Sequence, residues 1–202
     1  MKTISSCSAV IMIDPVDGED PFGKITNEYV IQGCNSSGRS CTPVPFVTPA
    51  LHVETGLDAV SKFGFGPACA PAFMSNDRFY DSWRGPIIQV NATKFGHLDC
   101  CDDGKASWYK LACASCGHGG GIAGTCKASR RQAYRASVGA AVGTFMEAVF
   151  RPRQGQPSNK TPAELLSQLT SPSNFPFETV LRHDWHGINP GDVAAGCKWV
   201  GE

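Results

Sequence analysis

One apolar run near the start of the chain constrains the fold more than any other feature. Residues 9–13 (Ala-Val-Ile-Met-Ile) are apolar and partly β-branched, and the run stops on Asp14, with Pro15 and Gly18 just beyond. A short apolar run bounded by such residues predicts a buried strand. Open α/β sheets place their chemistry at the carboxyl ends of their strands, so Asp14 is a candidate functional residue.

A second strand-like run leads to a histidine in the same manner. Residues 87–92 (Ile-Ile-Gln-Val-Asn-Ala) predict a strand, and His97 follows it. A carboxylate that comes before a histidine in the chain matches the last two members of the Ser, Asp, His order of α/β-hydrolases. Asp14 and His97 are therefore the predicted catalytic residues. Of their competitors, Asp17 is expected in a turn and His52 in strand packing.

The remaining elements predict part of a larger α/β domain. We expect a third strand at 50–54, helices at 76–83, 129–150 and 161–170, and a linker with a partly disordered extension over 151–202. In the helix at 129–150, Ser129 and Gln132 form a capping-box pattern, and an apolar stripe is expected to pack on the sheet. Three parallel strands with one long helix leave the sheet incomplete, because parallel sheets need both faces covered. Residues 1–150 are thus predicted to be the C-terminal half of such a domain.

Composition excludes some classes of function. Lys and Arg total 18 and Asp and Glu total 18, so a formal net charge of zero gives no electrostatic basis for binding nucleic acid. No apolar run approaches the roughly 18 residues that a membrane-spanning helix needs. We therefore expect no nucleic-acid partner and no transmembrane segment, with the oligomeric state open.

The cysteines allow more than one interpretation. Cys113, Cys116, His118 and Cys126 have the residue types of a tetrahedral zinc site. Their Gly-rich spacing is irregular for a zinc module, and disulfides or free thiols are favoured over a metal. No metal and no other cofactor is predicted. Cys100 and Cys101, beside His97, are expected to be packing residues.

Several segments resemble the corresponding stretches of chlorophyllases, in the family's order and at compatible spacings over roughly residues 1–150. They are 8–18 (Ser-Ala-Val-Ile-Met-Ile-Asp-Pro-Val-Asp-Gly), 54–57 (Glu-Thr-Gly-Leu), 67–71 (Pro-Ala-Cys-Ala-Pro), 76–80 (Asn-Asp-Arg-Phe-Tyr) and 95–99 (Phe-Gly-His-Leu-Asp). The resemblance implies an α/β-hydrolase that cleaves the phytyl ester of chlorophyll to chlorophyllide and phytol. It also implies a small-molecule partner, an ester, and a chloroplast location, with Asp14 as triad acid and His97 as general base.

The sequence departs from that family at the nucleophile. Chlorophyllases carry a serine in a Gly-His-Ser-x-Gly elbow, and no Gly-x-Ser-x-Gly occurs in these 202 residues. Ser40 has a glycine two residues before it but lacks the second glycine and follows the acid. Losing the serine of a triad costs about 10⁶ in turnover. The chain alone is therefore expected to be inactive.

Two alternatives to a chlorophyllase stay open. One is a general carboxylesterase or lipase of the same fold, and the other is a non-catalytic remnant that binds pigment or lipid. Four aromatic residues are expected, by analogy with the family, to form a surface for a phytyl chain or porphyrin, although ordinary loop packing would use the same residues: Phe73, Phe79, Tyr80 and Trp83.

Overall fold

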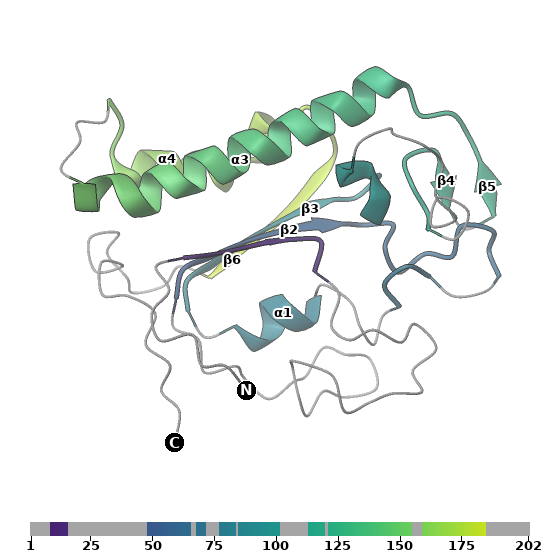
Figure 1. The fold of residues 1–202 in the computed structure, drawn as a ribbon, viewed down its shortest axis with the longest axis horizontal. Coiled ribbons are helices and arrows are strands. Elements are labelled where there is room, and N and C mark those ends of the chain that lie inside the picture. Colours follow the sequence, from purple (N-terminus) through teal and green to yellow (C-terminus); the bar gives the residue numbers. More distant parts are fainter. Residues whose placement is uncertain are drawn as a thin grey trace.

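A four-stranded sheet forms the centre of the protein (Figure 1). The computed structural model describes residues 9–15, 48–65, 68–71, 77–83, 85–101, 113–119, 121–154 and 159–184. The strands are β1 (Val10–Ile13), β2 (Ala50–Thr55), β3 (Ile87–Ala92) and β6 (Thr179–Asp184), in that spatial order. β1, β2 and β3 are parallel, whereas β6 runs antiparallel to β3. The predicted α/β class and its three parallel strands are confirmed.

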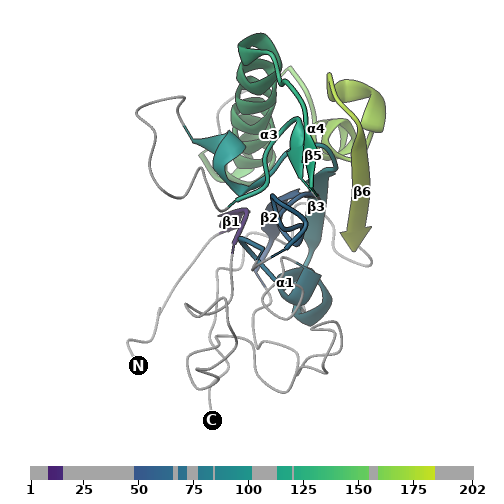
Figure 2. The ribbon, with the colours of Figure 1, turned by 90° about the vertical axis from the view of Figure 1, so that its right-hand side faces the viewer.

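Helices cover both faces of the sheet. α3 (Ala128–Gln154) and α4 (Pro162–Leu169) lie on one face, and the short α1 (Asp77–Ser82) lies on the other (Figures 1 and 2). Two 3-10 turns, η2 (His97–Cys100) and η3 (Pro172–Asn174), and a small hairpin of β4 (His118–Gly119) and β5 (Ile122–Ala123) complete the described part. Within it, no helix is long and apolar enough to cross a membrane.

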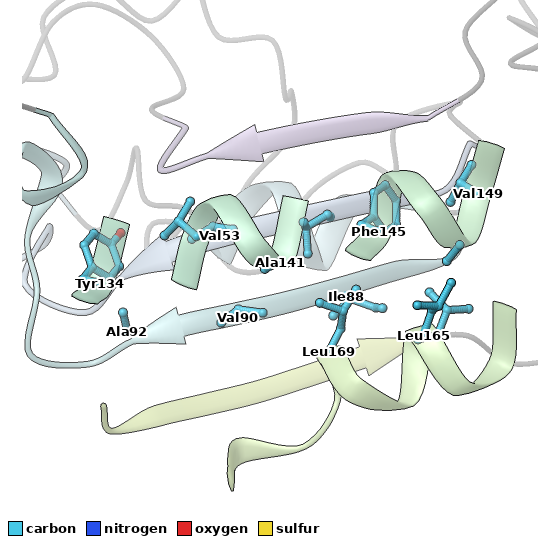
Figure 3. Packing of buried hydrophobic residues seen from close by; sticks show 14 of the residues in the cluster. Val53, Ile88, Val90, Ala92, Tyr134, Ala141, Phe145, Val149, Leu165 and Leu169 are labelled. Carbon is cyan, nitrogen blue, oxygen red and sulfur yellow. The ribbon is translucent and has the colours of Figure 1, made fainter. Parts of the chain in front are cut away.

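The apolar core lies between the sheet and the α3–α4 layer (Figure 3). Alternate residues of β2 and β3 face this layer because successive side chains of a strand point to opposite faces. α3 contributes the stripe expected from its helical spacing, and α4 adds three leucines. The main contributors are Leu51, Val53, Ile88, Val90, Ala92, Tyr134, Val138, Ala141, Phe145, Val149, Leu165, Leu166 and Leu169.

The ends of α3 differ from the prediction. The helix begins at Ala128, so Ser129 lies inside its first turn and is not the N-cap. Its last turn runs past Pro152 to Gln154, where a stop near residue 150 was predicted. Pro152 has no backbone N–H to donate to the carbonyl four residues before it, so it removes one bond from the last turn, and the helix ends two residues later.

Residues 159–184 were wrongly expected to belong to an extension. The predicted helix at 161–170 is present as α4, capped by a reciprocal Thr161–Glu164 capping box, and its Leu169 is 3% exposed. β6 then pairs with β3 along six residues. Strand pairing depends on a distant partner, so the weak local pattern of this segment did not reveal β6. Residues 185–202 lie outside the described part.

The α1 side of the sheet is polar although it is buried. His52, Glu54 and Gln89 are each at most 8% exposed, and the Gln89 amide donates a hydrogen bond to Glu54 Oε2 at 2.7 Å. Burial raises the pKa of Glu54 to about 8, and the nearby Asp77 carboxylate adds to the increase. Arg182 of β6 forms ion pairs with Asp77 and Asp81 of α1.

Leu169→Ala tests whether α4 belongs to the cooperative core. Removing a leucine that is 3% exposed is expected to lower the free energy of unfolding by about 2–5 kcal/mol. Met146→Ala is the control, because Met146 is 41% exposed on α3 and its loss should change stability by less than about 1 kcal/mol. Equal effects of the two variants in urea unfolding would show that α4 does not share the core.

Glu54→Gln tests the buried carboxyl. The folded-state pKa of Glu54, about 8, lies above the ordinary value of 4.5 for a glutamate, so the folded chain holds this proton more tightly than the unfolded chain. The stability that this proton contributes is complete below about pH 4.5 and is lost as the pH rises through 8. We expect the variant to resemble the native chain at pH 4.5 and to exceed its stability by a few kcal/mol at pH 8.5. Equal stabilities at both pH values would contradict this.

Candidate active site

The carboxyl ends of the three parallel strands bring the predicted site residues together. Asp14 directly follows β1, Thr55 ends β2, and His97 follows β3 at the start of η2. Because parallel strands end at the same edge of a sheet, residues more than 80 positions apart in the chain meet there. His97 Nδ1 lies 2.9 Å from Asp14 Oδ2 across a sequence separation of 83.

Asp14 is held in place by its backbone and by both carboxylate oxygens. Its φ of 51° lies in the left-handed region, which residues other than glycine rarely adopt. Its N–H donates to the Val53 carbonyl at 2.6 Å. Oδ1 accepts the Thr55 N–H, and Oδ2 accepts the Thr55 hydroxyl, both at 2.8 Å. With 2% exposure, this carboxylate is a fixed acceptor for His97.

A second carboxylate, which the sequence reasoning missed, faces the same imidazole. Asp58 Oδ2 lies 3.6 Å from His97 Nδ1, and Asp58 Oδ1 accepts the Thr55 hydroxyl at 2.7 Å. The hydroxyl carries one proton, so Thr55 bridges the two carboxylates and donates to one of them at a time. The sequence did carry a sign of Asp58, because this carboxylate follows β2 in the way that Asp14 follows β1.

The electrostatics of this cluster favour a protonated histidine. The hydrogen bond to Asp14, with Asp58 adding to it, raises the pKa of His97 well above its usual value. Burial raises the pKa of Asp14 to about 6, against the opposing effect of its hydrogen bond with His97. With Nδ1 bound to Asp14, the other ring nitrogen, Nε2, remains for proton exchange with a further group.

Hydrogen bonds to the Asp99 carboxylate anchor the loop that carries His97. Asp99 Oδ2 accepts two backbone N–H groups, from Gly96 at 2.9 Å and from Cys116 at 2.6 Å. A Cβ at position 96 would lie 2.0 Å from the Ala114 carbonyl oxygen, so glycine permits this close approach. Asp99 therefore stabilises the loop and fixes the position of the imidazole.

The cysteines near this loop form disulfides. Cys69 bonds to Cys113, and Cys116 bonds to Cys126. The zinc alternative is therefore wrong for this structure, because three of its four proposed ligands are cysteine sulfurs that are already bonded in two different disulfides. The sequence left disulfides and free thiols open, and Cys113, Cys116 and Cys126 form disulfides.

The aromatic residues of and after α1 contact neighbouring segments. The Trp83 indole donates to the Thr48 carbonyl at 2.8 Å, and Arg182 stacks on Tyr80 with its Cζ 3.9 Å from the ring centroid. Such contacts are those that ordinary packing would make, and the phytyl or porphyrin surface stays a prediction. Phe73, together with Asp17 and Ser40, lies outside the described residues.

Asp14, Asp58 and His97 are also the described residues whose side-chain atoms could meet on one cation, all within 4.8 Å of one another. A histidine nitrogen binds a metal only without its proton. His97 Nδ1 instead faces a carboxylate at hydrogen-bond distance, and its raised pKa favours the proton. The cluster is therefore better suited to proton transfer than to a metal.

The raised pKa of His97 can be measured by NMR titration of its imidazole resonances. We expect Asp14→Asn to lower that pKa most, because the Asp14 hydrogen bond is the largest cause of the increase. Asp58→Asn should lower it less, and Asp184→Asn, an exposed control on β6, should leave it unchanged. A His97 pKa that stays unchanged in both Asp14→Asn and Asp58→Asn would contradict the contacts described above.

Two comparisons with known proteins indicate the family of this chain. A model of the family described as Chlorophyllase matches residues 1–164. The curated protein Chlorophyllase-2 from Arabidopsis thaliana is 33% identical over 108 residues, which are 50% of this chain. That match covers 32% of the relative's length, so the chain spans about a third of it. With the family model covering most of its length, this chain belongs to the chlorophyllase family.

Proposed function

We propose that this chain supplies the acid and the general base of a serine ester hydrolase. Asp14 is the acid and His97 is the base. The observation that carries the proposal is the 2.9 Å contact between His97 Nδ1 and Asp14 Oδ2 at the carboxyl ends of β1 and β3. Family membership supports an ester as the substrate.

In this mechanism His97 moves the proton. Nε2 takes the proton of a serine hydroxyl as that oxygen attacks the ester carbonyl, and Asp14 stabilises the imidazolium that results. Nε2 then returns the proton to the leaving alcohol. The buried bonds from Thr55 to Asp14 keep the carboxylate aimed at Nδ1 throughout. Because only a neutral imidazole can accept the proton, the raised pKa of His97 shifts activity toward alkaline pH.

In this proposal the nucleophilic serine lies on a segment outside these 202 residues. β1 is an edge strand of the described sheet, and Ile13 at its end is 45% exposed. An edge with an exposed apolar residue is suited to a further strand of the same sheet. This chain, including α4 and β6, would then act as the C-terminal half of the hydrolase domain, with the serine elbow on the complementary half.

The proposed substrate is chlorophyll, cleaved at its phytyl ester to chlorophyllide and phytol. The chlorophyllase match supports this substrate, and a chloroplast location would follow from where chlorophyll is found. A general carboxylesterase or lipase has the same acid and base, so chlorophyll and an aryl ester must be compared as competing substrates.

Pigment or lipid binding without catalysis is a second candidate. Phe63 and Phe65, in the segment that follows Asp58, are 52% and 79% exposed. Exposed aromatic side chains near a candidate site are suited to an apolar ligand. Retained chlorophyll binding by the chain without hydrolysis, together with a transcript whose upstream frame lacks a serine elbow, would favour this candidate.

Complementation tests the catalytic proposal. The chain is co-expressed with an N-terminal segment of a chlorophyllase that carries the serine elbow, and chlorophyllide release is measured. We expect hydrolysis from the pair and not from either part alone. Asp14→Asn should lower turnover by about 10⁴. His97→Gln should lower it by about 10⁶, because serine and histidine act as a unit.

Two exposed residues of β6 provide matched controls. Asp184→Asn and His183→Gln repeat the same chemical changes away from the site and should leave turnover unchanged. A complemented pair that forms a stable complex and hydrolyses no ester would overturn the proposal. Sequencing the transcript from its 5′ end adds a genetic test, since an in-frame upstream Gly-His-Ser-x-Gly is expected.

A further inference from the structure

Two adjacent thiols lie directly after the candidate base. Cys100 ends η2 and Cys101 follows it, with their Sγ atoms 3.9 Å apart. Both are free thiols, whereas Cys69, Cys113, Cys116 and Cys126 are paired in disulfides. A pair of neighbouring thiols can react as one unit, which separates these two from the structural cysteines.

Cys100 is bonded to the residue that carries the imidazole. Its S–H donates to the carbonyl oxygen of His97 at 3.0 Å. It is half-buried, and that burial raises the pKa of its thiol. Cys101 is exposed, and Arg135 Nη1 donates to its carbonyl oxygen at 2.6 Å. A soluble reagent therefore reaches the exposed Cys101 thiol first. The Cys100 thiol lies next to it and is bonded to the His97 carbonyl.

We propose that Cys100 and Cys101 form a two-thiol modification site that low-molecular-weight disulfides oxidise to a disulfide between the adjacent residues. The Cys101 thiolate attacks one sulfur of the small disulfide, which breaks its S–S bond and releases one thiolate. Cys100 then loses its proton and attacks the Cys101 sulfur, which forms the Cys100–Cys101 bond and releases the second thiolate. The two cysteine protons end on the two small thiols, so two cysteines are oxidised and one disulfide is reduced.

The Cys100–Cys101 disulfide closes a small ring through the peptide bond between the two residues, and this ring is easily opened again. Adjacent Cα atoms lie about 3.8 Å apart across a trans peptide, closer than the roughly 4.4–6.8 Å of ordinary disulfides. Strained and exposed disulfides are more readily reduced than structural ones. We therefore expect the Cys100–Cys101 bond to open under milder reduction than the Cys69–Cys113 and Cys116–Cys126 bonds.

Closing the ring changes the support of His97. The two sulfurs must approach from 3.9 Å to about 2.05 Å, and a disulfide sulfur has no proton to donate. The bond from Cys100 to the His97 carbonyl is then lost. The oxidation state of the thiol pair is thereby transmitted to the imidazole, whatever reaction the imidazole performs.

Peptide mapping of the full chain tests the site without any measurement of catalysis. The chain is equilibrated with mixtures of reduced glutathione and glutathione disulfide, free thiols are alkylated, and the chain is cut with trypsin. Cleavage after Lys94 and Lys105 yields peptide 95–105, which contains Cys100 and Cys101 and no other cysteine. At glutathione ratios where both structural disulfides persist, we expect the mass of this peptide to fall by two hydrogen atoms and its cysteines not to be alkylated. Reduction should restore both its mass and its alkylation.

Two variants and one spectroscopic readout complete the test. Cys100→Ser should leave a stable glutathione adduct on Cys101, and Cys101→Ser should react more slowly, because only the half-buried thiol remains. His97 imidazole resonances should shift on oxidation of the native chain and not in Cys100→Ser, in which the adduct forms on Cys101 and no Cys100–Cys101 bond can close. The proposal is overturned if peptide 95–105 carries only glutathione adducts or links to another peptide. Unchanged His97 resonances in the ring-closed chain would overturn the coupling to the imidazole.

Discussion

Parallel alignment of β1, β2 and β3 is the constraint on which the rest of the site depends. It brings the residues after each strand to one edge of the sheet, so that Asp14, Thr55 and His97 meet although they are distant in the chain. The core between the sheet and α3 holds that alignment. A change of one residue in strand register would turn side chains to the opposite face, because the period of a strand is two.

The site itself is a compact network of protons and acceptors. One hydroxyl, on Thr55, links two carboxylates, and His97 Nδ1 faces both of them at 2.9 and 3.6 Å. A second carboxylate beside the imidazole increases its affinity for a proton. The same contact that orients a base therefore also makes it a stronger base, and one that is neutral only at higher pH.

The loop behind the imidazole couples the site to cysteine chemistry. Asp99 ties the loop to the backbone of Cys116, a residue held in a disulfide with Cys126. Cys100 ties the carbonyl of His97 to a free thiol. The loop that carries the imidazole is thus bonded to the backbone of a disulfide-paired cysteine and, through the His97 carbonyl, to a free thiol. A change in the oxidation state of the free pair would remove the second of these bonds.

Local sequence patterns were enough to predict the three parallel strands, the long and short helices on the core face, and the two residues, Asp14 and His97, that meet at the site. These features depend on local apolar periods and on residue order. Three features became visible in the folded chain alone: β6 as the fourth strand, Thr55 and Asp58 at the site, and the cysteine pairs. They depend mostly on contacts between distant residues, such as Thr55 with Asp14, which are 41 positions apart, and Cys69 with Cys113, which are 44 positions apart. A local sequence pattern does not identify such distant partners.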